Sequence, residues 1–510
     1  MYPGEEHQDA RPVRSATDGE YQSMRTNPSK TTGEDGPVRA GRGLARHDRG
    51  PTVESHAASP PAEGDLRSDE GIPLLDPERD TSSAGVRSRV LRERVQVAHG
   101  EVRALLHRDE VRRGGELFPT APVVAVLHPL AEPVLRQRVH NAVRCLEQVV
   151  RGYPRDRELQ EFLDVPPVMR RWVLAEPEPE GLRVDLCRLD LLGGTLGTVR
   201  VLEFNASSPG GVIPLGVISR RWRESSLGAL LADWGAVEAR FEEPNWFADW
   251  LLDHGRDHAV PEGDCRRVGL FHDPACAEID PQAHVQLRRR GCSAVALDPA
   301  EFVPGSGLRL GYLKHIPVAP RAVEGWQRFC AALTDKSLVV PNALAARWVA
   351  ENKLCLAVLS DPRFRHLFTA RQQEVLDAIV PFSRKLGDGV SPAEAVADQQ
   401  RLVLKAPYGR CGESVVIGRR TPRDEWARLV RDDERRGWLV QEVVEAAEVE
   451  GWTGQHVRDL VVPVLNGRVL GFGSRIGRGA LLNVARGNAI SAVFGSHDPA
   501  AGTAEAPRTR

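Results

Sequence analysis

Hydrophobic and polar positions divide the chain into a long polar start, an extended patterned middle and a short polar end. Residues 1–90 mix Gly, Pro, Ser, Asp, Glu and Arg with almost no apolar periodicity, and residues 496–510 do the same. Such segments cannot bury enough apolar surface to offset the conformational entropy that ordering costs. We therefore expect a disordered leader over residues 1–90 and a flexible tail over residues 496–510.

The first part of the patterned middle predicts helices and strands in irregular alternation. Apolar residues at helical spacing start near Val90, and a long amphipathic helix is predicted over residues 130–153. Apolar runs at 121–130, 182–192 and 198–204 predict strands. Because a Gly-rich turn joins the last two runs, they are predicted to form a hairpin.

A different pattern begins at Arg267. A strand, a helix that ends at Gly291 and a second strand follow one another. This order is typical of an α/β unit with a parallel sheet, which we expect over residues 266–312.

The last part of the patterned middle predicts helices followed by a sheet. Helices are expected over residues 322–334 and 342–360, and residues 401–486 are expected to form an antiparallel sheet with one helix. Asn466 and Gly467 stand between two apolar runs of this segment. Asn-Gly in that position is the strongest short signal for a β-hairpin.

Composition narrows the class of protein. The 510 residues carry 68 Lys plus Arg against 70 Asp plus Glu, a formal charge of -2, whereas dedicated nucleic-acid binders usually carry a basic excess. No apolar run is long enough to cross a bilayer, and the first residues lack the apolar centre of a signal peptide. We therefore expect a cytoplasmic protein with no nucleic-acid or membrane partner. The eight cysteines form no CxxC pair, so they predict neither a disulfide framework nor a zinc site.

Lysine is scarce, which makes each lysine informative. The chain has only six lysines, so 62 of its 68 basic residues are arginines. A lysine retained against this bias is more informative than usual as a candidate for a specific role.

The first candidate site lies on the predicted hairpin near residue 200. Asp190 precedes the turn, and Glu203 and Asn205 follow it on one face of the second strand. Three hard oxygen donors on adjacent strands are a usual partial shell for Mg²⁺. The alternative is a solvated hairpin, but a carboxylate within an apolar strand must find a charged partner. The following turn, 207–211, is either an anion-binding loop or a plain one.

The second candidate site combines a strand lysine with a glycine-containing loop. Lys405 ends an apolar strand, and a loop with Gly409 and Gly412 leads into the next strand. Such a loop lets backbone N–H groups approach a polyphosphate. It is not a Walker A loop, because the lysine comes first and stands on a strand. The alternative is an ordinary hairpin.

Three further signals are weaker when taken singly. Lys353 follows Asn352 in mid-helix, where a solvated lysine is the usual interpretation. Gln441 and Glu442 lie on a strand whose edge groups either face a purine or merely pack. Arg475 is either a cation that neutralises a transferring phosphoryl group or a surface salt-bridge partner. Taken together, the five signals supply the parts needed to hold Mg-ATP and to stabilise charge at its γ-phosphate.

The order of these motifs resembles a known family. Six segments resemble the circularly permuted ATP-grasp ligases of the glutathionylspermidine synthetase type: RLDL (188–191), LEFNASSPGG (202–211), AENKLCLAVL (350–359), LVLKAPYGRCGESVVIG (402–418), WLVQEVVE (438–445) and VLNGRVLGFGSRIG (464–477). The resemblance covers roughly residues 120–490. In that family the strand pair with the acidic residues and Asn precedes the lysine strands, as it does here.

The resemblance implies a fold and a domain order. The fold is α+β/α/β, a circularly permuted ATP-grasp with a small Rossmann-like α/β subdomain. The implied domains are the leader 1–90, the N-terminal part of the ATP-grasp core with the Mg-binding strands at 91–262, the α/β subdomain at 263–335, the ATP-binding lobe at 336–495 and the tail 496–510.

The resemblance also implies roles for individual residues. Mg²⁺ is ligated by Asp190, Glu203 and Asn205. The phosphoryl group and the acyl phosphate are stabilised by Arg188 and Arg475. ATP is bound by Lys353, Lys405, Tyr408, Gly409, Gly412, Glu413, Ser414, Gln441, Glu442 and Val443. The loop 408–414 closes over the phosphates, and residues 440–443 form the adenine hinge.

The implied reaction joins a carboxylate to an amine. A carboxylate attacks the γ-phosphate of ATP, and an amine then displaces phosphate to form an amide. The substrates are a small-molecule or peptide carboxylate and an amine acceptor, in natural-product biosynthesis or elsewhere. Ser207 and Ser208 stand where the family often has an acidic residue and Thr, which puts the acceptor side in doubt. Two alternatives remain: a small-molecule kinase on the same fold, and a non-catalytic ATP-grasp module that binds a partner.

Overall fold

The computed structural model describes residues 70–83, 89–178, 181–207, 209–272, 279–314, 323–409, 412, 414–449 and 456–497. All of them belong to Gly64–Arg510, one of the two units into which internal contacts divide the chain. Among these residues, no helix combines the length and the apolar character that a membrane span requires.

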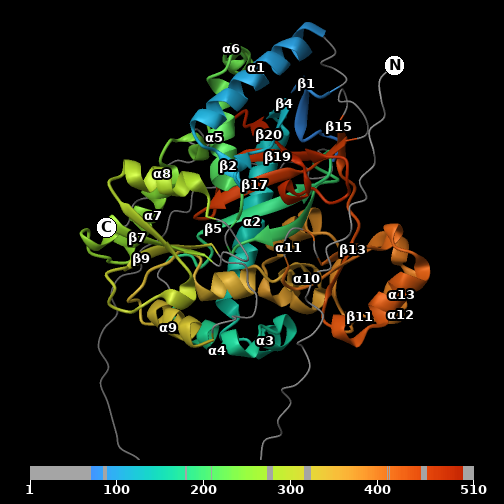
Figure 1. Cartoon of the computed structure of the whole chain (residues 1–510). Helices are drawn as coiled ribbons and strands as arrows, with labels where there is room; N and C mark the ends of the chain where they lie inside the picture. The colour runs from blue at the N-terminus through green and yellow to red at the C-terminus, as the bar shows by residue number, and fades with distance from the viewer. Residues whose placement is uncertain are drawn as a thin grey trace, which may run out of the picture. The chain divides into compact units, whose positions relative to one another are not determined.

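A ten-stranded mixed sheet forms the largest part of the described fold (Figure 1). Its main path runs β1 (Leu75–Asp80), β4 (Thr120–Leu127), β20 (Ala489–Phe494), β19 (Phe472–Gly477), β17 (Leu460–Leu465), β5 (Leu186–Leu192) and β6 (Arg200–Asn205). Three short strands pair outside this path: β18 (Arg468–Val469) with β17, β16 (His456–Arg458) with β19, and β15 (Ala447–Val449) with β16. Only β4 and β20 pair in parallel along the main path.

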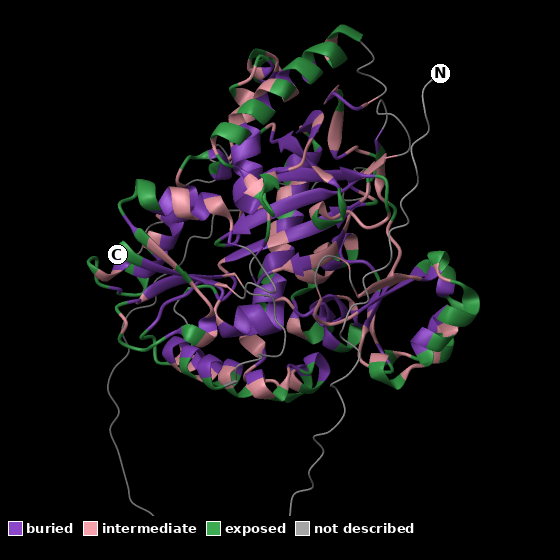
Figure 2. Cartoon of the chain, viewed as in Figure 1, coloured by how far each residue is buried: buried purple, intermediate pink, exposed green. Residues whose placement is uncertain are grey.

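The two faces of this sheet are buried by different helices. Along β17, Val462 and Val464 belong to a core cluster with residues of α2 (Ala131–Gly152). Val461 and Leu465, which alternate with them, pack in a second cluster with α1 (Arg89–Arg108) and α5 (Val212–Arg223). Figure 2 shows the central strands of the sheet buried and much of α1 exposed.

A separate five-stranded sheet forms the middle part of the predicted ATP-binding lobe, and the last strands of that lobe belong to the ten-stranded sheet. Its order is β11 (Gly389–Val390), β10 (Ser383–Leu386), β14 (Leu439–Glu442), β12 (Leu402–Lys405) and β13 (Val415–Ile417). Trp426 of α13 (Arg423–Arg431) and Ala395 of α12 (Pro392–Ala397) pack on it. The expectation of one sheet over residues 401–486 is therefore wrong. The alternation of apolar and polar residues shows which face of a strand is buried, but it does not show which strand is the partner. Strand β17, which was assigned to this sheet, pairs with β5 of the ten-stranded sheet instead.

The α/β unit has the predicted parallel sheet. Strands β7 (Arg267–His272), β8 (Ser293–Leu297) and β9 (Leu310–Lys314) pair in parallel in the order β8-β7-β9. Helix α8 (Pro281–Arg289) connects β7 to β8, and α7 (Trp246–Asp257) packs beside α8 and β9. The remaining helices are α3 (Arg157–Leu163), α4 (Pro167–Ala175), α6 (Gly228–Asp233), α9 (Val323–Thr334), α10 (Leu354–Ser360) and α11 (Ala370–Ile379).

Both predicted hairpins are present. Strands β5 and β6 pair antiparallel, and β17 turns into β18 through Asn466 and Gly467. Both turn residues have positive φ, 49° and 74°, as a type I′ turn requires. Order begins earlier than the pattern indicates, because β1 lies within the predicted leader and pairs with β4. A single edge strand is too short to produce a periodic signal.

Asn342 joins the start of β5 to the end of β6. Its Oδ1 accepts hydrogen bonds from the N–H groups of Asp185 (2.7 Å) and Leu186 (3.0 Å), and its Nδ2 donates to Ala206 O (2.7 Å). Asn342 has a φ of 48°, which Asn tolerates better than most residues. These bonds hold the two strands in register where they reach the candidate site.

Asp185, beside Asn342, makes the stability of this joint depend on pH. Burial raises the pKa of Asp185 to about 7, although a hydrogen bond from Asn342 N–H opposes the effect. Between about pH 4 and pH 7 the folded protein therefore keeps a proton on Asp185 that the unfolded chain has lost. The contribution of the protonated carboxyl to the free energy of unfolding is complete below about pH 4 and is lost as the pH rises through about 7.

We expect Asp185→Asn to raise Tm by a few degrees at pH 8 and to leave it unchanged or lower at pH 4, because the amide carries no charge to desolvate. Thermal unfolding at both pH values checks this, with the exposed Asp233→Asn as the control. Equal effects of Asp185→Asn at the two pH values would contradict it.

Candidate functional site

A cavity of about 520 Å³ brings together the ten-stranded sheet, the five-stranded sheet and the α/β unit. The ten-stranded sheet contributes Arg188, Asp190, Glu203, Asn205 and Arg475, and the five-stranded sheet contributes Lys405 with the loop that follows it. Predicted site residues that line it are Arg188, Asp190, Glu203, Asn205, Lys353, Lys405, Gly409, Gly412, Ser414 and Arg475.

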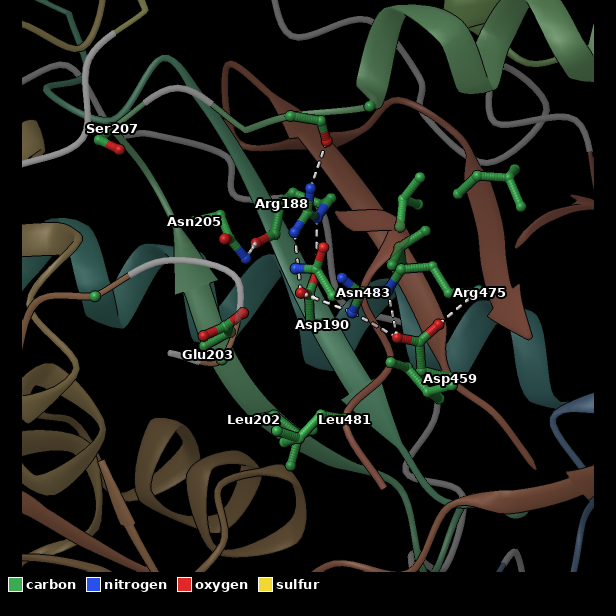
Figure 3. Close-up of a pocket in the computed structure, with 18 of the residues that line it drawn as sticks. Arg188, Asp190, Leu202, Glu203, Asn205, Ser207, Asp459, Arg475, Leu481 and Asn483 are labelled. Carbon is green, nitrogen blue, oxygen red and sulfur yellow. Dashed lines mark hydrogen bonds and ion pairs between the residues drawn. The ribbon is translucent and has the colours of Figure 1, made fainter. Parts of the chain in front are cut away.

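The strand pair β5–β6 explains why four of these side chains share one face. Asp190 lies opposite Glu203, and Arg188 lies opposite Asn205. Residues directly opposite each other, and residues two apart, project from the same side of a sheet. Figure 3 shows the four side chains along the two strands. A register shift follows Asp190, where a β-bulge interrupts the regular pairing.

Two arginines hold Asp190. The Arg188 guanidinium donates to both carboxylate oxygens at 2.7 and 3.0 Å, and Arg475 Nη2 donates to Oδ2 at 2.8 Å. Burial alone would raise the pKa of Asp190, but the two guanidinium groups outweigh it and hold this pKa well below its usual range. Asp190 is therefore an anion in the fold.

Asp459 is a site residue that the sequence analysis missed. It accepts hydrogen bonds from Arg475 N and Nε, both at 2.7 Å, so Arg475 bridges two buried carboxylates (Figure 3). Both carboxylates raise the pKa of Arg475 against the effect of burial. The available signal was an acidic residue directly before the apolar strand 460–465, the same kind of signal that pointed to Glu203.

The donor set fits a magnesium ion in part. Glu203 has a side chain 30% exposed toward the cavity, and the Oδ1 of Asn205 is available because this residue uses its Nδ2 to donate to Arg188 O. Both oxygens are of the type that Mg²⁺ prefers. Asp190, in contrast, has both oxygens occupied by arginine. Across the described residues, no cluster of three or more His, Cys, Asp and Glu is arranged to hold a metal.

Lys405 lies at the end of β12, where it meets β6. Its Nζ donates to Leu202 O at 3.0 Å and to Gln441 Oε1 at 2.6 Å. The lysine is buried, and desolvation lowers its pKa to about 8 although Glu203 opposes the effect. Gln441, predicted as part of the adenine hinge, thus holds Lys405 through its side chain.

Lys353 reaches the cavity because the predicted helix is interrupted. Residues 342–360 were expected to form one helix with Lys353 in its middle, but a π-helical turn at Ala346–Ala350 ends before Glu351, and α10 starts after Lys353. Asn352 Oδ1 accepts from Leu354 N–H and so stabilises this break. Lys353 Nζ donates to Gly409 O at 3.3 Å and lies 3.7 Å from Glu203 Oε2.

Glu351 is a second residue that the sequence analysis missed. Its Oε2 accepts the N–H groups of Ala206 (2.6 Å) and Ser207 (2.7 Å), and so anchors the turn that follows β6. Burial raises its pKa, with Lys353 opposing. Its sequence signal was its place directly before Asn352 and Lys353.

Several predicted nucleotide-binding residues lie away from the cavity lining. Tyr408 donates its hydroxyl to Trp348 O and accepts from Asn352. The N–H groups of Glu442 and Val443 are bonded to the carbonyls of Phe382 and Arg401. Glu413 is outside the described residues. The roles assigned to these four residues stay predictions, as do the roles of the residues that line the cavity.

Comparisons with known proteins find distant likenesses among solved structures. No protein-family model and no curated protein matches the chain. Among solved structures, a glutathione synthetase-like effector (GSS30) from Globodera pallida in its apo form aligns with a TM-score of 0.47 and 12% identity, covering 80% of this chain and 97% of that one. A putative gamma-glutamylcysteine synthetase from Methylobacillus flagellatus KT aligns with a TM-score of 0.31 and 13% identity, covering 66% and 83%. Because both TM-scores are below 0.5, neither likeness assigns a fold or an activity to this chain.

Proposed function

We propose that this chain is a Mg-ATP-dependent carboxylate–amine ligase with a permuted ATP-grasp core. The observation that carries the proposal is the composition of one cavity. A strand pair with Arg188, Asp190, Glu203 and Asn205 faces Lys353, Lys405 and a glycine-containing loop from a second sheet. A metal-bound polyphosphate requires oxygen donors that bind the metal ion and cationic groups that bind the phosphates, and this cavity has both on opposite sides.

Each group of residues in the cavity has a separate role in the proposed phosphoryl transfer. Lys405 and Lys353 contact the phosphates, and the 408–414 loop closes over them. Glu203 and Asn205 hold Mg²⁺, which when bound neutralises charge on the phosphate oxygens. Arg188 and Arg475 stabilise the charge that develops as a carboxylate attacks the γ-phosphate, and an amine then displaces phosphate from the acyl phosphate. Fixed charges of this kind act without a nucleophilic side chain.

A small-molecule kinase on the same core is the competing function. A kinase forms ADP with one acceptor and leaves a phosphorylated product, whereas a ligase forms ADP and free phosphate when an acid and an amine are both present. We therefore test ADP and phosphate release with pooled acids, pooled amines and both pools together. Release only with both pools supports the ligase. ADP formation with one pool and no free phosphate supports the kinase.

Glu203→Gln tests the metal assignment. The amide keeps one oxygen but loses the negative charge, so we expect at least a tenfold rise in the Mg²⁺ concentration that gives half-maximal ATP turnover. Glu448→Gln, a more exposed carboxylate on β15, is the control. An unchanged Mg²⁺ requirement in Glu203→Gln would remove this residue from the metal site.

A further inference from the structure

The α/β unit contributes a cation to the same cavity. Lys314 is the last residue of β9, and the carboxyl ends of β7, β8 and β9 share one edge because the strands are parallel. Ligands of open parallel sheets bind in the crevice outside this edge. Lys314 lines the cavity there, together with Asp280 and Pro281 at the start of α8.

Lys314 and Arg188 meet at one glycine. A Cβ built on Gly210 would lie 3.6 Å from Lys314 Nζ, and Arg188 donates a hydrogen bond to Gly210 O. The next residue, Gly211, is the N-cap of α5, and no side chain caps this helix end. The first N–H groups of α5 and the positive end of its dipole therefore face the same turn. Cations from two different sheets and a helix N-terminus thus converge beside the phosphoryl-transfer residues.

The acidic groups of this end are bonded to backbone amides. Asp280 caps α8 by accepting Gln282 N–H at 2.9 Å, and Glu351 accepts the two N–H groups of the turn after β6. Burial lowers the pKa of Lys314 to about 8, although Asp280 opposes the effect. An anion entering beside Lys314 would favour the charged form of the lysine, as the neighbouring Asp280 and Glu351 already do.

We propose that the α/β unit binds the acid substrate rather than the amine, and that Lys314 pairs with its carboxylate beside Arg188 at the Gly210–Gly211 turn. The identification of the bound carboxylate as the acid substrate rests on the proposed ligase function. The carboxylate lies next to the arginine that stabilises the γ-phosphate, which is where it must be to attack. A methyl group on Gly210 would lie at ordinary van der Waals distance from Lys314 Nζ, so it would narrow the space beside the lysine without displacing it.

Direct binding tests this inference without turnover. We titrate the full chain, loaded with Mg²⁺ and a non-hydrolysable ATP analogue, by calorimetry with acetate, hexanoate, succinate, glutamate and trialanine, and separately with butylamine and 1,4-diaminobutane. The variants are Lys314→Met, Lys314→Arg and Gly210→Ala. Lys336→Met and Gly263→Ala are the matched controls, since Lys336 is exposed and a Cβ on Gly263 has no neighbour within 4 Å.

We expect at least one acid to bind the wild type, and Lys314→Met to weaken it roughly ten- to hundredfold, the loss typical of a charged hydrogen bond. Lys314→Arg should retain more affinity than Lys314→Met, Gly210→Ala should lose affinity, and the two controls and all affinities for the ATP analogue should stay unchanged. No acid binding, or equal acid binding in Lys314→Met and wild type, would overturn the inference. Acid binding through Lys314 without ADP formation would uphold it and overturn the ligase function.

Discussion

Replacing Lys405 with Met is expected to lower ATP turnover at least a hundredfold while the protein stays folded. Lys405 Nζ lies where the five-stranded sheet meets β6, within hydrogen-bond distance of Leu202 O and Gln441 Oε1. Removing one preorganised charged donor from such a site typically costs about 10²–10³ in rate. Methionine keeps most of the buried volume, so the change is mainly one of charge. Steady-state ADP formation and binding of an ATP analogue measure the effect.

The control for Lys405→Met is Lys336→Met, which makes the same replacement at an exposed lysine outside the cavity. Circular dichroism and the unfolding midpoint verify that both variants fold. If Lys405→Met turned over ATP at the wild-type rate, the cavity would not be the nucleotide site, and the assignment of the adjoining 408–414 loop would fail with it.

Replacing Arg475 with Met is expected to be the most destabilising single change in the site. Arg475 bridges Asp190 and Asp459, and its loss leaves Asp459 buried without a cation. Breaking a buried ion pair by removing one partner typically costs about 3–5 kcal/mol. Asp190 keeps Arg188, so the cost arises mainly at Asp459. Denaturant unfolding measures the free energy of unfolding directly.

A second variant separates the structural role of Arg475 from its proposed role in phosphoryl transfer. In Arg475→Met with Asp459→Asn the buried charge is removed together with its partner, so we expect the free energy of unfolding to recover most of the loss. ATP turnover should stay abolished, because the cation beside the γ-phosphate is still missing. Recovery of both stability and turnover would show that Arg475 serves the fold alone.

The sequence predicted the local elements of this fold better than their assembly. The hairpin 182–204, the Asn466-Gly467 turn and the parallel unit after Arg267 all follow from patterns of a few residues. The division of residues 401–486 between two sheets does not, because the partner of β17 is β5, more than 250 residues earlier. Pairing at such a separation leaves no trace in a single sequence.

The candidate site shows the same limit. Residues that stand out by type in an apolar strand, Glu203 and Lys405, were identified from the sequence and line the cavity. Asp459 and Lys314 also end or begin apolar strands, but their relevance depends on two other sheets. The break at Asn352 was not foreseen either, because its cause is a side-chain bond to Leu354 N–H and a π-helical turn in a segment with regular helical spacing.

Trapping of the activated acid tests the central claim most directly. Hydroxylamine replaces the amine and captures an acyl phosphate as a hydroxamate, which is detected by its ferric complex or by mass. With Mg-ATP and an acid that the protein binds, we predict hydroxamate formation equal in amount to ADP, dependent on ATP and absent in Lys405→Met. ADP formed with this acid and no hydroxamate, or hydroxamate formed at the wild-type rate by Lys405→Met, would contradict a carboxylate-activating ATP site in this cavity.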